Sequence, residues 1–313
     1  MDFSVVIPTK DREEDLAACI ESVARQVLLP IEVLVVDDGA IGEGVRRAIE
    51  GELGRAGISF RYFKKDKPGS AESKNLGAKE ATGELVLFLD DDVVLEREYI
   101  SSLGQIWEKR GGESRLAGVC GVIRNARAKR RAERVFNRIF CLHSSKSWSI
   151  LGWGFQTWDY GLRGEQQVEW TPCGLTSFRR EVLNRYRFRA LEQGRTALED
   201  LEFCWRLLRD GYHFIMAESA GLVHKAASAG REGAFAAGYK EGYNRCLIFQ
   251  RHAEKSFKNR LCFLVASVGW IIRKWFAAFL EPRSAAKYLL CGLGIIAGNF
   301  GFLLNRLCKR NES

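Results

Sequence analysis

The stretch that decides the fold is Leu85-Val86-Leu87-Phe88-Leu89-Asp90-Asp91-Asp92-Val93. Five apolar residues in a row are typical of a strand that is buried on both faces of a sheet. Three carboxylates then follow, at the point where such a strand ends. Like charges this close repel one another unless a cation neutralises them. The stretch therefore predicts a buried strand that presents an acidic cluster, with a plain acidic surface turn as the alternative.

The acidic cluster suits a divalent metal. Hard cations such as Mg²⁺ and Mn²⁺ prefer carboxylate oxygens and keep coordination positions open for substrate phosphates. We therefore expect Mg²⁺ or Mn²⁺ to bind at Asp90-Asp91-Asp92.

Upstream of this stretch, strand and helix patterns alternate. Apolar runs predict strands at 3–7, 31–36, 59–63 and 85–89, and helical periodicity predicts helices at 12–26 and 70–81. This alternation predicts an α/β fold with a mainly parallel sheet covered by helices on both faces. Ligands bind such sheets beyond the carboxyl ends of the strands.

Polar residues follow the strands where ligands are expected. Pro8-Thr9-Lys10-Asp11 follows the first strand and Asp37-Asp38-Gly39 the second. A carboxylate after the second strand could accept hydrogen bonds from a ribose or a base edge, or belong to an acidic turn. Asp11 and Glu14 have the spacing of a helix capping box, which would explain Asp11 without a ligand, although both roles can coexist.

Composition indicates a folded protein with an anionic partner. The chain has 313 residues, of which 46% are hydrophobic and 28% charged, and its formal net charge is +9. A positive charge suits nucleic acid, acidic lipid or a phosphorylated substrate. The nine cysteines show no metal-binding spacing, so we expect reduced thiols. The chain enters a strand at once without a signal-peptide pattern, so the catalytic part is expected in the cytosol.

The middle and the end of the chain change in character. Residues 124–165 combine a basic run with tryptophans, which favours an inserted loop or helix near the active-site mouth or, alternatively, a solvated helix face with core aromatics. The tail from 235 is helical, with uncharged stretches at 261–272 and 288–304. The first stretch is shorter than the ~20 residues that span a bilayer, and the second is borderline.

The spacing Gly294-xxx-Gly298 in the second stretch suits close helix packing in lipid. With basic residues flanking both stretches, we expect membrane association as an interfacial pair or a short hairpin, with a buried core helix as the alternative. The expected division is a domain at 1–234, with an insertion at about 124–165, and a membrane-associating region at 235–313.

Four motifs, in this order and spacing, resemble the GT-A fold glycosyltransferases of family 2, which are mostly inverting enzymes. They are Val5-Val6-Ile7-Pro8-Thr9-Lys10-Asp11-Arg12, Val35-Val36-Asp37-Asp38-Gly39, Gly69-Ser70-Ala71-Glu72-Ser73-Lys74-Asn75-Leu76-Gly77 and Phe88-Leu89-Asp90-Asp91-Asp92. Lys74 stands where the family more often has arginine, which puts a base or phosphate contact there in doubt. The resemblance covers about residues 3–225.

The resemblance implies a Rossmann-like, mostly parallel GT-A sheet and a nucleotide-sugar donor. Its implied nucleotide contacts are Pro8, Thr9, Asp11, Asp38, Lys74, Asn75, Asp90 and Asp91. Asp92 is expected to bind the metal directly, with Asp90 or Asp91 shared between ribose and metal. His224, which ends an apolar run, resembles the family's additional metal or diphosphate contact, although a lone histidine is more often structural.

Two downstream segments complete the resemblance. The segment from Trp170 to Arg180, with Gly174 at its centre, resembles the family's donor-sugar and acceptor loop, or else is a plain turn before a helix. The next segment contains Glu199-Asp200, matching the position of the family's catalytic base, and Asp200 is the expected general base. Thr196 and Glu199 also fit a capping box, and Asp200 would sit in a first helical turn, where the helix dipole favours an ionised carboxylate.

The expected reaction is transfer of a sugar, with inversion, from a nucleoside diphosphate to an acceptor hydroxyl of a lipid-linked or surface glycan at the cytoplasmic face of a membrane. Two other classes of protein stay open. A metal-dependent nucleotidyltransferase would show a glycine-and-basic loop after the first strand, where Pro8-Thr9-Lys10-Asp11 stands. A non-enzymatic nucleic-acid-binding protein would suit the positive charge but leaves the three acidic strand ends unexplained, so we expect no nucleic-acid partner.

Overall fold

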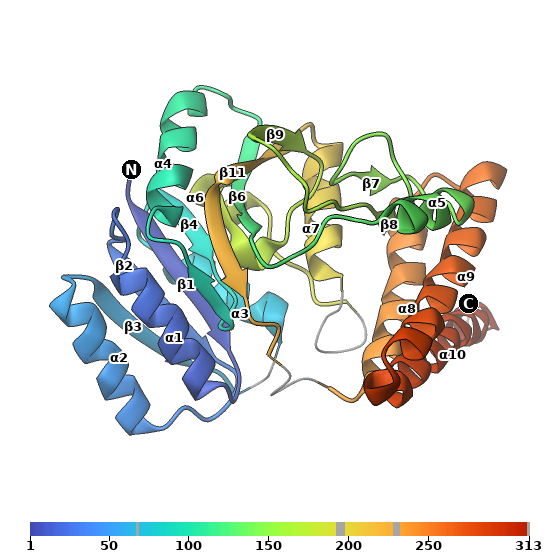
Figure 1. Cartoon of the computed structure of the whole chain (residues 1–313), viewed down its shortest axis with the longest axis horizontal. Coiled ribbons are helices and arrows are strands. Elements are labelled where there is room, and N and C mark those ends of the chain that lie inside the picture. The colour runs from blue at the N-terminus through green and yellow to red at the C-terminus, as the bar shows by residue number, and fades with distance from the viewer. Residues whose placement is uncertain (67–68, 192–197, 228–231, 312–313) are drawn as a thin grey trace. The chain divides into compact units, whose positions relative to one another are not determined.

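A computed structural model describes residues 1–66, 69–191, 198–227 and 232–311 (Figure 1). The chain forms two compact units. Unit 1 comprises Met1–Ala128, Asp159–Ala190 and Phe203–Gly230, and unit 2 comprises Lys129–Trp158, Leu191–Glu202 and Arg231–Ser313. Part of the predicted insertion thus belongs to the same unit as the C-terminal helices. The sequence pattern gives no sign of this grouping.

Unit 1 is an α/β unit, as expected. Its strands are β1 (Phe3–Thr9), β2 (Glu32–Asp37), β3 (Ser59–Lys64), β4 (Leu85–Phe88), β5 (Val93–Leu95), β6 (Leu116–Ile123), β9 (Glu165–Val168), β10 (Thr176–Arg179) and β11 (His213–His224). Its helices are α1 (Glu13–Ala24), α2 (Glu43–Arg55), α3 (Ser70–Glu80), α4 (Tyr99–Arg110), the 3₁₀ turn η1 (Cys173–Leu175), α6 (Arg180–Arg185) and most of α7 (Glu199–Arg209).

Within the described residues the strands of unit 1 form one sheet in the order β3-β2-β1-β4-β10-β6-β11-β5, with β9 beside β11. The first four strands are parallel, as the alternating pattern predicts, and so are β6 and β11. β10 is antiparallel to both of its neighbours, so the sheet as a whole is mixed. The order turns back at β1, with β2 on one side of it and β4 on the other.

The apolar runs explain the centre of this sheet. The side chains of β2 and β4 are all buried, and those of β1 are buried except at Pro8. Because crossovers between parallel strands are right-handed, α1 and α2 lie on one face and α3 on the other. Figure 1 shows α1 and α2 side by side, and the two helices are in contact. Ligand-binding residues are therefore expected where β1, β2 and β4 end.

Unit 2 is mainly helical. It contains α5 (Arg131–Ile139), the hairpin of β7 (Ile150–Leu151) and β8 (Phe155–Gln156), α8 (Ala234–His252), α9 (Phe257–Leu280), the 3₁₀ turn η2 (Pro282–Ser284) and α10 (Ala285–Asn311). A small core of Leu142, Leu151, Phe155 and Ala266 joins the segment 129–158 to α9. All nine cysteines of the chain are free thiols.

The glycines predicted to pack closely do so, between α10 and α8. A Cβ atom on Gly294 would collide with the carbonyl oxygen of Phe235, and one on Gly298 with that of Tyr239. In return, Gly238 and Gly242 of α8 approach the backbone of α10, so glycines four apart on both helices form one seam. Small residues at such spacing let two helix backbones approach closely.

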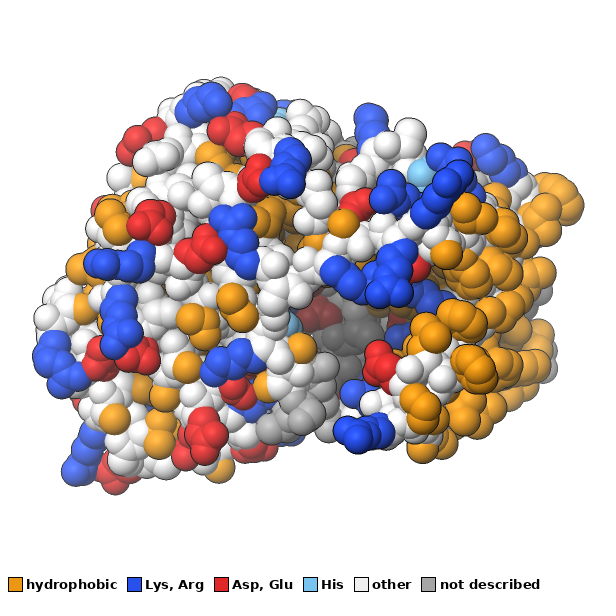
Figure 2. Space-filling view, viewed as in Figure 1, with side chains coloured by type: hydrophobic (Ala, Val, Ile, Leu, Met, Phe, Trp, Pro, Cys, Tyr) orange, Lys and Arg blue, Asp and Glu red, His pale blue; other side chains and the backbone are white. Residues whose placement is uncertain are grey.

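α9 and α10 are long and apolar. Each is long and apolar enough to cross a membrane by length and composition, and only 22% and 28% of their most apolar windows are buried. The apolar stretch 261–272 is thus part of a helix of 24 residues, longer than the uncharged run alone suggests. In Figure 2 hydrophobic side chains cover the surface over these helices.

The predicted capping box at Asp11 and Glu14 is wrong. The N-cap residue of α1 is Arg12, and no side chain caps the helix. Asp11 has a φ of 53°, a left-handed conformation, and its carboxylate accepts a hydrogen bond from Ala40 N at 3.1 Å. The turn after β1 therefore directs Asp11 towards the loop after β2, where its carboxylate caps a different backbone amide.

Candidate active site

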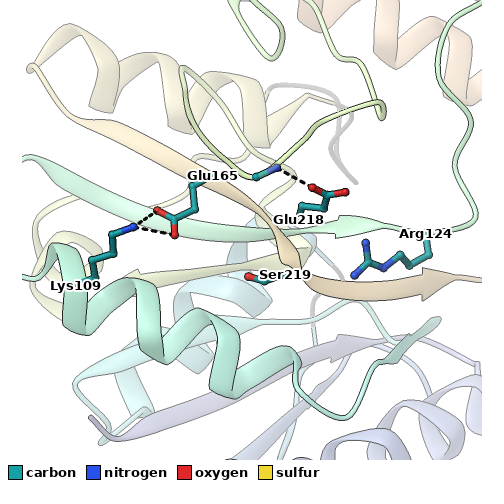
Figure 3. A pocket seen from close by; sticks show the side chains of 6 residues that line it. Lys109, Arg124, Glu165, Glu218 and Ser219 are labelled. Atoms are coloured by element: carbon teal, nitrogen blue, oxygen red, sulfur yellow. Dashed lines mark hydrogen bonds and ion pairs between the residues drawn. The ribbon is translucent and has the colours of Figure 1, made fainter.

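A shallow hollow of about 790 Å³ lies on unit 1 beside the middle of β11 (Figure 3). Its charged lining residues are paired with one another or with neighbours. Lys109 contacts Glu165 at 3.3 Å, Arg124 contacts Glu96 at 2.9 Å, and Glu218 contacts Arg163 at 3.0 Å. Because these charges are already neutralised, the hollow does not have the chemistry of a phosphate or metal site.

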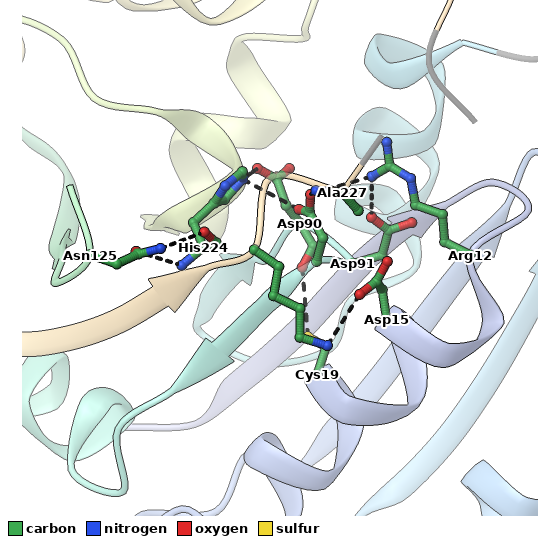
Figure 4. Close-up of polar contacts among 10 residues, drawn as sticks. Arg12, Asp15, Cys19, Asp90, Asp91, Asn125, His224 and Ala227 are labelled. Carbon is green, nitrogen blue, oxygen red and sulfur yellow. Dashed lines mark hydrogen bonds and ion pairs between the residues drawn. The ribbon is translucent and has the colours of Figure 1, made fainter. Parts of the chain in front are cut away.

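The acidic turn after β4, Asp90-Asp91-Asp92, has carboxylates suited to a metal site (Figure 4). β4 is buried throughout and ends at Phe88, so Asp90, Asp91 and Asp92 follow where the strand leaves the core. The Asp90 amide donates to the carbonyl of Gly174 at 2.8 Å, which ties the turn to η1. A Cβ atom on Gly174 would collide with the Asp90 carboxylate, so this close approach requires glycine.

Asp90, Asp92 and His224 converge. His224 ends β11, next to Val93 of β5, and its Nε2 lies 3.3 Å from Asp92 Oδ1 and 3.7 Å from Asp90 Oδ2. One ligand atom from each of the three residues lies within 4.8 Å of the other two. Asp92 is buried and the side chain of Asp90 is 46% exposed, so the cluster is fixed on one side and open on the other.

Two backbone contacts hold this cluster in place. The Asn125 side chain donates to the His224 carbonyl at 2.9 Å and accepts from the His224 amide at 3.1 Å. The Ala227 amide donates to Asp92 Oδ2 at 2.8 Å. Asn125 was not predicted from the sequence, because a lone asparagine after a strand gives no signal of this pairing.

The donor set fits a divalent cation. Two carboxylates and one imidazole nitrogen are ligands that Mn²⁺ accepts, whereas Mg²⁺ is more strictly selective for oxygen. Without a cation two carboxylates this close would repel each other. Asp90, Asp92 and His224 are therefore able to hold the metal that the acidic turn suggests.

Asp91 points away from this set. Its two carboxylate oxygens accept hydrogen bonds from Thr9 Oγ1 and from an Arg12 guanidinium nitrogen, both at 2.8 Å. Burial raises the pKa of Asp91 above its ordinary value, although Arg12 and Thr9 act in the opposite direction. Asp91 and Thr9, both expected to contact the nucleotide, thus bind each other and fix the turn between β1 and β4.

Arg12 is a second residue that sequence reasoning missed. Its side chain is 10% exposed and also lies 3.7 Å from Asp92 Oδ2, so it supplies positive charge to two of the three aspartates. It belongs to the motif Val5–Arg12, and nothing in that motif indicates a role for it. An arginine next to an acidic turn in space cannot be recognised until β1 and β4 are known to be neighbours.

The ends of β1 and β2 bring Asp11 and Asp38 to the same region of unit 1. Asp38 accepts hydrogen bonds from Gly69 N at 2.8 Å and Ser73 Oγ at 2.9 Å and lies 3.0 Å from Lys65 Nζ. It therefore ties the end of β2 to the start of α3.

Asp37, the neighbour of Asp38, is fully buried. It accepts hydrogen bonds from Gly39 N, Ile41 N and the Tyr62 hydroxyl. Burial works to raise the pKa of Asp37, but the hydrogen bonds from Tyr62, Ile41 and Gly39 outweigh it and lower the pKa below its ordinary value. Burial and the contact with Asp37 raise the pKa of Tyr62 to about 12. Of the two aspartates, Asp37 is structural.

Lys74 and Asn75 on α3 both contact Phe188. The Asn75 side chain donates to the Phe188 carbonyl at 2.8 Å and accepts from its amide at 2.9 Å. Lys74 is buried, with its ammonium group 5.1 Å from the centre of the Phe188 ring. Both side chains thus brace the chain after α6.

The loop from Trp170 to Gly174 is buried as well. Trp170 is 8% exposed, so its ring belongs to the core. The Cys173 and Cys204 thiols lie 3.9 Å apart and share the Thr171 carbonyl as an acceptor. Gly174 lies beside Asp90, which relates this loop to the acidic turn after β4.

Glu199 and Asp200 form the first turn of α7, where the unit boundary falls. Thr196, the predicted partner of Glu199 in a capping box, lies outside the described residues. Glu199 is buried and Asp200 is partly exposed.

Comparisons with known proteins identify the family of the chain. The model of the family described as glycosyl transferase family 2 matches residues 4–186, more than half of the chain. The chain is 34% identical over 92 residues to the uncharacterized glycosyltransferase YwdF of Bacillus subtilis, covering 29% of this chain and 33% of YwdF. It is 31% identical over 120 residues to the GalNAc(5)-diNAcBac-PP-undecaprenol beta-1,3-glucosyltransferase of Campylobacter jejuni, covering 38% of each.

Among solved structures, the chain resembles the mannosyltransferase PcManGT from Pyrobaculum calidifontis in complex with GDP-Man and Mn²⁺. The TM-score is 0.56 at 16% identity, over 97% of this chain and 87% of the other. At this identity the likeness shows the fold alone. The sequence matches span little more than a third of the two bacterial relatives.

Proposed function

This chain belongs to glycosyltransferase family 2, and on that premise we propose that it transfers a sugar from a nucleoside-diphosphate donor to an acceptor hydroxyl, with inversion at the anomeric carbon. The observation that carries the proposal is the convergence of Asp90, Asp92 and His224 at the ends of β4 and β11. Two carboxylates and an imidazole at the edge of an α/β sheet suit a metal that binds a diphosphate.

Asp90, Asp92 and His224 would hold Mn²⁺ or Mg²⁺. When bound there, the metal would neutralise charge on the diphosphate leaving group as a Lewis acid. Asp92 and His224 would present their ligand atoms in one geometry, because Ala227 N holds the Asp92 carboxylate and Asn125 holds the His224 backbone. Arg12 would keep Asp91 ionised and in place.

The nucleoside would bind at the ends of β1 and β2. We assign Asp11 and Asp38 to the base and ribose, since both carboxylates follow these strands. Pro8 would shape the same edge, and Thr9 and Asp91 would support it through their mutual hydrogen bond. Lys74 and Asn75 of α3 would support the site indirectly, because both hold Phe188 in place.

Asp200 would be the general base. It would take the proton of the acceptor hydroxyl as that oxygen attacks the anomeric carbon, an effect typically worth ~10²–10⁴-fold in rate. Since no leaving oxygen needs a proton, one carboxylate suffices, unlike the paired acids of glycoside hydrolases. Glu199, Trp170 and Gly174 would contribute to the donor and acceptor loop.

The acceptor would be a lipid-linked or surface glycan at the cytoplasmic face of a membrane. The support is the exposed apolar length of α9 and α10, together with the lipid-linked substrate in the name of the Campylobacter relative. The catalytic domain would be 1–234 and the membrane-associating region 235–313.

A nucleotide-release assay tests this proposal. The full chain in detergent is offered a panel of UDP, GDP and dTDP sugars with Mn²⁺, Mg²⁺ or EDTA, beside Asp92→Ala and Asp200→Asn. We expect metal-dependent release from one donor, lost in both variants, with nucleotide binding lost only in Asp92→Ala. Absence of both release and metal-dependent binding for every donor would contradict the proposal, whereas binding without release calls for addition of an acceptor.

A further inference from the structure

The positive charge of the chain is concentrated in unit 2. The residues of unit 2 include 21 lysines and arginines against 10 acidic residues, a net charge of +11. Unit 1 has 27 basic against 29 acidic residues, a net charge of −2. The excess charge therefore belongs to the unit that also carries the exposed apolar helices, not to the unit that carries the proposed donor site.

α5 combines both properties on one short helix. Val135 is 51% exposed and Ile139 is 65% exposed, and the two lie four residues apart, so they share one face of the helix. Arg131, Arg134 and Arg138 are exposed as well. An exposed apolar pair framed by arginines is the pattern of a helix that lies in a membrane interface.

Two phenylalanines, one on α5 and one directly after it, fix the helix to α9. Phe136 and Phe140 pack against the core that includes Ala266 of α9. A Cβ atom on Gly269 would collide with the Phe140 side chain. The ring can therefore pack this closely against α9 only because residue 269 is a glycine. The arginines of α5 are thus presented beside a helix whose outward apolar residues include Leu264, Val268 and Phe276.

The arginines of α5 differ from exposed arginines of unit 1 in their partners. Among the residues that the structure describes, no acidic group lies within ion-pair distance of Arg131, Arg134 or Arg138; the guanidinium of Arg134 donates to the Lys129 carbonyl. By contrast, three exposed arginines of unit 1, Arg25, Arg47 and Arg55, each pair with a glutamate. Three guanidinium groups on one short helix, none with a carboxylate partner among the described residues, are available to an anionic partner.

Trp158 lies beside two further basic side chains of unit 2. The Lys129 ammonium lies 4.8 Å from the centre of the Trp158 ring, and the Arg273 guanidinium of α9 lies 5.7 Å from it. Tryptophan and long basic side chains are enriched at the level of lipid headgroups. Figure 2 shows the Lys and Arg side chains over α5 directly beside the hydrophobic surface over α9 and α10.

We propose that α5 is a headgroup-binding helix that docks unit 2 on the surface of an anionic phospholipid bilayer. Val135 and Ile139 enter the interface, and Arg131, Arg134 and Arg138 bind lipid phosphates beside the apolar surface of α9. The arrangement suits the cytoplasmic leaflet, whose anionic lipids attract basic segments. This docking goes beyond the catalytic proposal and does not depend on it.

The test compares two short-chain lipids binding to the full chain in neutral detergent. Dioctanoyl-phosphatidylglycerol and dioctanoyl-phosphatidylcholine are titrated, and binding is followed by intrinsic tryptophan fluorescence. We expect the wild-type chain to prefer the anionic lipid, and Arg131→Gln/Arg134→Gln/Arg138→Gln to weaken that binding by about 10- to 100-fold. Binding of phosphatidylcholine should stay unchanged in this variant.

The matched control is Arg25→Gln/Arg47→Gln/Arg55→Gln, which removes the same charge from unit 1 and should bind like the wild type. Replacing the α5 arginines by lysine keeps the charge and should retain most of the preference. Equal wild-type affinity for both lipids, or an equal loss in the unit 1 control, would overturn the proposal. So would binding of a labelled DNA or RNA duplex that depends on the α5 arginines while lipid binding does not.

Discussion

The imidazole of His224 and the carboxylate of Asp92 lie 3.3 Å apart, between the ends of strands that are far apart in the sequence. Neither residue alone identifies a metal site, because a lone histidine after a strand and an acidic turn are both common. Their approach depends on the antiparallel pairing of β5 with β11, which places His224 opposite Val93, the residue after Asp92.

His224→Ala should raise the Mn²⁺ concentration needed for half-maximal binding at least about 10-fold, because one of three ligands is lost. Direct titration of Mn²⁺ in the absence of donor measures this. His213→Ala is the matched control, since His213 lies 3.0 Å from Glu113 and outside the cluster. The imidazole also favours Mn²⁺ over Mg²⁺ in the wild type. Equal Mn²⁺ affinity in His224→Ala and the wild type would contradict this ligand assignment.

Arg12→Gln should lower the free energy of unfolding by about 3 kcal/mol, because it leaves the carboxylate of Asp91 buried without its cation. Chemical denaturation of the full chain measures the loss. The double variant Arg12→Gln/Asp91→Asn should regain part of it, since the buried charge is then gone. A double variant as unstable as the sum of the single variants would show that the two side chains act independently.

Asp37 should make stability depend on pH. Folding lowers the pKa of Asp37, so the unfolded chain binds this proton more readily than the folded chain. The stabilisation is present above the unfolded pKa, near ~4, and is lost as the pH falls through it towards the lower folded pKa. Asp37→Asn should therefore flatten the fall in melting temperature on acidification, whereas Asn at the exposed Asp66 should leave it unchanged. Equal acid sensitivity of Asp37→Asn and the wild type would argue against this role.

Gly298→Ala should destabilise unit 2 by about 1–3 kcal/mol, because the new methyl group collides with the Tyr239 carbonyl in the seam. Thermal unfolding in detergent measures the change. Gly51→Ala on α2 is a matched control with open space around it, and it should be neutral or stabilise by up to about 1 kcal/mol. The same sign of change in both variants would mean that the seam does not depend on close approach.

The strands and the acidic turn could be predicted because their signals are local. The run from Leu85 to Leu89 indicates a buried strand whatever its neighbours are, and the carboxylates after it must lie at its end. Helix α2 was not predicted, and glycines at 44, 51 and 54 weaken its helical pattern. Its helical conformation is supported by packing against α1 and β3.

What the sequence could not provide are the contacts between distant segments. Arg12 and Asp91 meet only because β1 and β4 are adjacent, and Asn125 reaches His224 only because β6 pairs with β11. The predicted capping box at Asp11 was wrong for a related reason. The Asp11 carboxylate accepts a hydrogen bond from the Ala40 amide, which belongs to the loop after β2 and is distant in the sequence. Residues 129–158 likewise gave no sign that they join the core of α9.

The packing of Phe140 against Gly269 also sets an order of events during biosynthesis. α5 leaves the ribosome about 130 residues before the glycine that accepts its ring. At about 5–20 residues per second, the contact between Phe140 and α9 cannot form for on the order of ten seconds. The first strands and helices of unit 1 have all been made by then. The nascent chain therefore presents the basic and apolar side chains of α5 before α9 has been made. Early contact of α5 with the membrane would cover these side chains until α9 packs against Phe140.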